Sequence, residues 1–183
     1  RPGDMPHPKT RIPNCSDCSS GNGNGQIGDS LFKKITLSED ERHSFWIQLS
    51  KANLIKIKGF NPDNKIAEWG KAFMSAPIGG GIQVFFYDGI NDLPHIFGNI
   101  HPKKGHYLIL TNDVSGDLSN DNGHFLTPKQ AQWIDNSIDD GNPLTGSIVA
   151  AGHKRCVKQS GSKTVYREEL EDRCLSLYIR FSN

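Results

Sequence analysis

The sequence lacks any run of about 18 or more apolar residues, so no segment of its 183 residues has the character of a transmembrane helix. It also lacks an excess of charge of one sign: 21 Lys and Arg against 20 Asp and Glu give a formal net charge of +1. A near-neutral chain has no electrostatic footprint for nucleic acid, and no such partner is expected. Apolar residues make up only 35% of the chain, while 19 Gly and 10 Pro indicate much loop.

With this length the chain can bury a core of its own, so residues 1–183 are expected to form a single domain. No signal peptide is recognisable. The chain opens on Arg1 and not on Met, from which we expect that an upstream segment has been removed. Residues 1–37 are expected to be irregular, because their Pro, Gly and Asn residues oppose helix and central strand.

Four cysteines lie in two groups near the ends of the chain: Cys15, Cys18, Cys156 and Cys174. An even number in a loop-rich chain is typical of an oxidising compartment, so an extracytoplasmic location is expected. Spacing alone leaves three connectivities open. The C-x-x-C of the first group is interpreted as a local disulfide. The alternatives are a redox motif, which would need a helix where the chain is Gly-rich, and a zinc site completed by His7 or His153.

The strongest local signal is the segment 126–146, LTPKQAQWIDNSIDDGNPLTG. Thr127 suits an N-cap, Pro128 suits the first helical position, and Gln130 completes a capping box. The apolar residues that follow recur on one helical face, at Ala131, Ile134 and Ile138. The run DDGNP at 139–143 predicts that the helix ends in an acidic turn, and residues 147–151 predict a strand after it.

A second amphipathic helix is predicted over 38–56, with Ser38 and Glu41 as its capping box. Further strands are predicted at 82–87, 106–111 and 175–181, with 96–100 as a short strand or loop. Hairpins and long loops connect these strands, without regular βαβ units. The sequence therefore predicts an α+β fold with an antiparallel sheet.

The segment 131–148 also resembles the C-terminal half of bacterial prepilin-like proteins, which comprise type IV pilins, minor pilins and type II secretion pseudopilins. The shared pattern is A-x-x-I-D-x-x-I-D-D-G-x-P-x-x-G-x-V. It is present here as Ala131, Ile134, Asp135, Ile138, Asp139, Asp140, Gly141, Pro143, Gly146 and Ile148, the last in place of Val. Three other stretches resemble the same family and occur in its order: PGDMP at 2–6, NGNGQI at 22–27 and FWIQLSKANLI at 45–55.

The resemblance implies a four-stranded antiparallel sheet laid on a long N-terminal helix, which anchors in the membrane and then packs in a filament core. That helix is absent from this sequence and is expected upstream of Arg1. The resemblance implies a structural subunit of a pilus or pseudopilus, with other subunits as partners and no enzymatic activity. Without the helix, an apolar stripe of the sheet is expected to be uncovered.

The resemblance also bears on the cysteines, because many type IV pilins close a C-terminal loop with a disulfide. Cys156 follows the predicted strand 147–151 and Cys174 opens the strand 175–181. We therefore expect a Cys156–Cys174 bond that closes the loop 156–174, and a Cys15–Cys18 bond.

Two places invite a calcium interpretation. Asn22 and Asn24 alternate with glycines as in the first part of an EF-hand loop, but no carboxylate is present and Leu31 stands where a bidentate Glu belongs. A Gly/Asn loop tied by Asx turns is the favoured interpretation there. Asp139 and Asp140 could ligate Ca²⁺ with loop carbonyls, although their simpler role is to end the helix. No other cofactor is expected.

Two further classes of function stay open beside the filament subunit. One is a secreted, calcium-dependent binding or adhesion module. The other is an extracellular hydrolase, for which the sequence offers no recognisable triad or phosphate loop. Paired acid/base carboxylates at Asp135 and Asp139 are disfavoured because no second carboxylate group can be placed opposite them.

Overall fold

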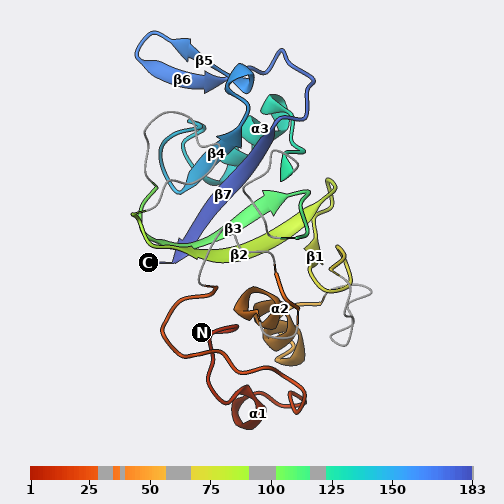
Figure 1. The fold of residues 1–183 in the computed structure, drawn as a ribbon. Coiled ribbons are helices and arrows are strands. Elements are labelled where there is room, and N and C mark those ends of the chain that lie inside the picture. Colours follow the sequence, from red (N-terminus) through yellow and green to blue (C-terminus); the bar gives the residue numbers. More distant parts are fainter. Residues whose placement is uncertain (29–34, 38–39, 57–66, 91–101, 116–122, 183) are drawn as a thin grey trace.

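The computed structural model describes residues 1–28, 35–37, 40–56, 67–90, 102–115 and 123–182, and its main element is a five-stranded sheet. The strand order is β1-β2-β3-β7-β4, and every neighbouring pair is antiparallel. The strands are β1 (Met74–Ser75), β2 (Gly81–Tyr87), β3 (Gly105–Thr111), β4 (Ile148–Gly152) and β7 (Leu175–Ser182). The α+β class with an antiparallel sheet is confirmed (Figure 1).

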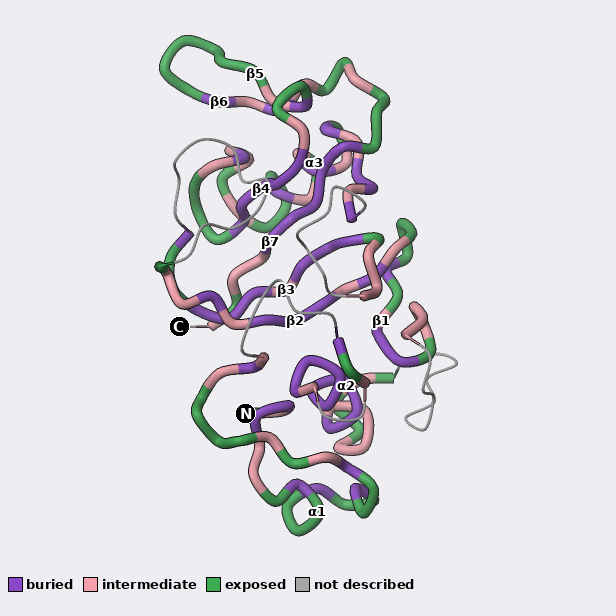
Figure 2. The backbone as a smooth tube through the Cα atoms, viewed as in Figure 1, coloured by how far each residue is buried: buried purple, intermediate pink, exposed green. Residues whose placement is uncertain are grey.

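The four strands expected from the resemblance are too few. The edge strand β1 pairs Met74 with Ile82, in a stretch predicted to be a connection. A separate hairpin, β5 (Val157–Ser160) and β6 (Lys163–Tyr166), lies in the loop 156–174. Its side chains are mostly polar and exposed, so the apolar alternation that marks a half-buried strand is missing. Figure 2 shows the contrast between the exposed β5 side and tip of this hairpin and the buried central strands, while β6 is partly buried. The predicted element at 96–100 lies outside the described residues.

Helix α2 (Glu41–Lys51) begins two residues later than its predicted capping box requires. Asp40 is the N-cap, and its carboxylate accepts a hydrogen bond from the Arg42 backbone N–H at 2.9 Å. Glu41 serves another segment: its two carboxylate oxygens accept the backbone N–H groups of Asn22 and Gly28 at 2.8 and 3.1 Å. The expected use of Glu41 as a capping partner is therefore wrong.

The N-terminal arm, residues 1–28, packs along α2 (Figure 1). Gly3 N–H donates to Gln48 Oε1 at 2.8 Å, and Gln48 Nε2 donates to the Ser19 carbonyl at 3.1 Å. The arm contains a helical turn, α1 (Pro8–Arg11), within the region expected to be irregular. Side chains of α2 thus organise the arm, which has little regular backbone structure of its own.

The structure joins Cys15 to Cys18 and Cys156 to Cys174, the pairing expected from the sequence. Both sulfurs of the first bond are buried against Ile47 of α2, so the C-x-x-C is a structural bond and offers no thiolates to zinc or to redox chemistry. The second bond spans Cα atoms 6.4 Å apart and closes the base of the β5–β6 hairpin. Two disulfides are compatible with an extracytoplasmic protein.

The register of the sheet assigns its side chains to two faces. On the first face, Val84 pairs with Leu108, which pairs with Ile179. Helix α2 packs against Val84 at one end of this face, and α3 (Pro128–Ile138) packs against Leu177 and β4 at the other. The second face buries an aromatic cluster made of Phe85, Tyr87, Tyr107 and Tyr178 with Ile109 and Ala151. The first face is therefore shared by two helices that lie apart.

Candidate functional site

Helix α3 and the turn after it form the segment of strongest sequence signal, and the structure accounts for its residues. The capping box is confirmed: Gln130 N–H donates to Thr127 Oγ1 at 3.2 Å, and Thr127 N–H donates to Gln130 Oε1 at 3.0 Å. Pro128 occupies the first helical position. The helix ends at Ile138, with Asp139 as C-cap.

The acidic residues of the turn accept hydrogen bonds from the turn itself. Asp139 Oδ2 accepts the backbone N–H of Ile148 at 2.9 Å and also that of Ser147. Asp140 Oδ1 accepts the N–H of Asn142 at 2.9 Å. These carboxylates thereby satisfy backbone donors that the turn would otherwise leave unpaired, and they connect the end of α3 to the start of β4.

Asp135 is fully buried and connects α3 to the hairpin. Its Oδ2 accepts a hydrogen bond from the Tyr166 hydroxyl at 2.8 Å, and its Oδ1 accepts the Gly141 N–H at 3.3 Å. Burial raises the pKa of Asp135 to about 6, while the bond from Tyr166 opposes that rise. A buried carboxyl with two donors is a structural anchor, and sequence reasoning had not identified Tyr166 as its partner.

The glycines and proline of the motif have conformational roles. Gly141 and Gly146 have φ of +72° and +81°, the left-handed region that favours glycine. A Cβ on Gly146 would also collide with the Asp139 carboxylate. The carbonyl of Pro143 accepts the Ala150 N–H of β4 at 2.9 Å. The I-D-D-G-x-P-x-x-G string therefore specifies a turn of fixed shape.

Among the described residues, one group of three carboxylates could hold a cation: oxygens of Asp135, Asp139 and Asp140 lie within 4.8 Å of one another. Both oxygens of Asp135, Oδ2 of Asp139 and Oδ1 of Asp140 already accept the hydrogen bonds described above. Asn22 and Asn24, the other expected calcium ligands, lie on the arm along α2 and do not join this group. Their Oδ1 atoms accept the N–H groups of Asn24 and Gln26 at 2.9 and 2.8 Å, as expected for Asx turns.

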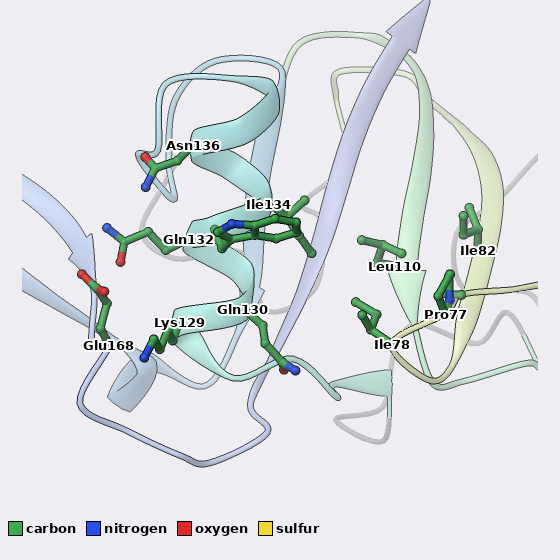
Figure 3. Close-up of a pocket in the computed structure, with 12 residues that line it drawn as sticks. Pro77, Ile78, Ile82, Leu110, Lys129, Gln130, Gln132, Ile134, Asn136 and Glu168 are labelled. Atoms are coloured by element: carbon green, nitrogen blue, oxygen red, sulfur yellow. The ribbon is translucent and has the colours of Figure 1, made fainter.

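A groove of about 680 Å³ lies between α3 and the turn that joins β1 to β2 (Figure 3). Ile82 and Leu110 of the sheet form its floor, Ile134 of α3 forms one wall, and Pro77 and Ile78 form the other. Polar side chains stand along the far side of α3, at Lys129, Gln132 and Asn136, with Glu168 facing them (Figure 3). The groove is thus apolar where it meets the sheet and polar at one margin.

The groove continues an incompletely covered part of the first sheet face. Ile82, Leu108 and Ile179 are only half-buried between the clusters of α2 and α3, and Phe181 at the end of β7 is 46% exposed. We call these four residues the open stripe. Trp133 and Ile78 on the rim of the groove are 71% and 42% exposed. Apolar side chains of this size indicate a surface that another chain segment can cover.

Sequence reasoning expected an uncovered stripe but did not name its residues. Trp133 was a detectable signal, since it is a large apolar residue that falls beside the predicted apolar face of α3; Ile138, which was predicted to lie on that face, is itself 61% exposed. No described helix has the length and apolar character needed to cross a membrane. No family model matches the chain, and neither the curated proteins nor the solved structures contain a significant match.

Proposed function

We propose that this chain is the globular domain of a type IV pilin-like or pseudopilin subunit that assembles into a filament. The observation that carries the proposal is the open stripe on the first sheet face, between α2 and α3. A half-buried apolar row flanked by two helices has the shape and chemistry to receive a third helix, which would bury the row on assembly.

The four prepilin-like stretches support this proposal by where they lie. The PGDMP stretch starts the arm, and NGNGQI provides the loop whose Asn22 N–H is held by Glu41 of α2. The FWIQLSKANLI stretch contains the C-terminal part of α2, which covers one end of the stripe, and the I-D-D-G turn orients α3 at the other end. Two of the four stretches therefore belong to the helices that border the stripe, and the other two pack on α2.

Substitutions in the stripe test the proposal in cells that make the full-length subunit. Ile82→Asp places a charge on the floor of the groove, where a docked helix would leave it buried and unpaired. We expect this variant to be folded, judged by circular dichroism of the purified domain, and to lose filament assembly judged by electron microscopy and shear fractionation. Ile90→Asp is the matched control, because Ile90 is 80% exposed and lies outside the stripe.

Normal filaments from a folded Ile82→Asp variant would refute the proposed mode of assembly. Equal loss of filaments in the Ile90→Asp control would show that the effect is not specific to the stripe. A site-specific cross-linker at residue 179 gives a second measure. If the proposal is right, residue 179 should be linked to a helix that belongs to a subunit of the same filament.

A further inference from the structure

The contact between Arg1 and His106 links the N-terminal arm directly to strand β3. Arg1 Nη1 lies 2.8 Å from His106 Nδ1 and 3.3 Å from its Nε2, and it also donates to the Gly25 carbonyl at 3.0 Å. An arginine side chain can only donate hydrogen bonds. The imidazole must therefore be neutral and must offer its lone pair for this contact to exist.

The surroundings of His106 leave little room for a charged ring. The side chain is fully buried, with Phe86 and Phe181 at ring-centroid distances of 5.0 and 5.9 Å. The Lys104 ammonium group lies 5.6 Å from the centroid of the Phe86 ring, so one positive charge is already close to the ring that packs on His106. Protonation would remove the acceptor and place a second positive charge next to Arg1 without water to solvate it.

We propose that His106 is an acid-sensitive latch: the neutral ring holds the first residues of the arm on β3, and the protonated ring releases them. The inference does not depend on the proposed filament role. It concerns only Arg1 and Pro2 and the contact of Arg1 with the sheet, while Gln48 holds Gly3 and Glu41 holds Asn22 on α2.

The other charged groups around His106 set the direction in which it responds. Burial, reinforced by Arg1, lowers the pKa of His106 to about 4, and Asp4 opposes that shift. Asp4 is itself buried, and its Oδ2 accepts the Gly25 N–H at 2.9 Å. The free ring would titrate near 6.5, so acid favours the released state increasingly as the pH falls from about 6.5 toward 4.

Nuclear magnetic resonance across pH 7.5 to 3.5 tests the latch on the whole chain. Ring shifts of His106 report its protonation, and the heteronuclear NOE of the Arg1 side-chain Nε–H reports release, while the Gly3 amide, which Gln48 holds, should stay ordered. We expect both signals to change together below about pH 5.5. Amides of β3 and β7 should keep their shifts over the same range.

Two variants make the test specific. His106→Gln retains an acceptor for Arg1 but cannot titrate, so the arm should stay ordered at acidic pH. Asp4→Asn retains the acceptor for Gly25 but removes the charge that favours protonation, so the midpoint should move to lower pH.

The latch is refuted if His106 titrates near 6.5 with the arm unaffected, or if His106→Gln releases its arm at the same pH as the native chain. Loss of β3 and β7 amide signals at the same pH as arm release would also refute it, because the event would then be unfolding of the whole domain.

Discussion

The two ends of the chain each contain a disulfide, yet different forces order them. The N-terminal arm has a short Cys15–Cys18 ring, and its Gly3 and Asn22 backbone N–H groups donate to the side chains of Gln48 and Glu41 on α2. The C-terminal hairpin has a larger ring, Cys156–Cys174, and a buried bond from Tyr166 to Asp135. The comparison teaches that the size of the ring a disulfide closes, and not the presence of a disulfide alone, decides how much it stabilises an end of the chain.

The largest expected difference comes from removing each disulfide. Replacing Cys156 and Cys174 together by Ser should lower the free energy of unfolding by about 3 kcal/mol. Their bond joins residues 18 positions apart and therefore removes much loop entropy from the unfolded chain. The same change at Cys15 and Cys18 should cost about 2 kcal/mol, because the ring is much smaller. Chemical denaturation of both double variants measures the difference, and an equal or reversed order would contradict the comparison.

The arm should depend on α2 about as much as on its own disulfide. Gln48→Ala removes the acceptor of Gly3 N–H and the donor to the Ser19 carbonyl, and should cost about 2 kcal/mol. Hydrogen exchange should also increase at Gly3 and Gly21 while the hairpin β5–β6 stays protected. Gln159→Ala on the exposed hairpin is the control. An unchanged denaturation midpoint for Gln48→Ala would show that these bonds do not hold the arm.

The hairpin should depend on its buried anchor in a pH-dependent way. Tyr166→Phe leaves one Asp135 oxygen buried without its donor and should cost about 1–2 kcal/mol at pH 7. Asp135 has a folded pKa near 6, above its unfolded value, so it is mostly charged at pH 7 and mostly neutral at pH 5. A neutral carboxyl tolerates loss of the donor better, so the cost should shrink at pH 5. Denaturant midpoints at both pH values provide the measurement, and an equal loss at each would contradict this account.

The same comparison explains what could be predicted from the sequence. Helix α3 and the turn that ends it were predicted because their signals are local: a capping box, an apolar period and the DDGNP helix stop. The hairpin was missed because most of its side chains are polar, so no apolar alternation marks its strands. The predicted start of α2 was wrong because Asp40 caps the helix while Glu41 accepts a hydrogen bond from the arm. The second role depends on a tertiary contact, which the local sequence does not show.

In the candidate site, too, the features with a local sequence signal could be predicted and the tertiary contacts could not. The carboxylates at Asp139 and Asp140 could be named from the sequence, but not their partners on β4 and in the turn. The groove combines Ile78 before β2, Leu110 on β3 and Trp133 on α3. Their proximity depends on strand order and on the placement of α3, which no local pattern of residues encodes.

The smallest expected effect concerns calcium at the end of α3. The oxygens of Asp139 and Asp140 already accept backbone N–H groups, so a cation would have to compete with bonds that shape the turn. We expect millimolar Ca²⁺ to change the melting temperature by less than about 1 °C. A larger rise that EDTA reverses and Asp140→Asn abolishes would contradict this expectation and would favour a calcium-dependent binding module over a filament subunit. A rise abolished instead by replacing Asn22 and Asn24 would assign the ion to the N-terminal arm, and would mean that its Asx turns give way to metal coordination.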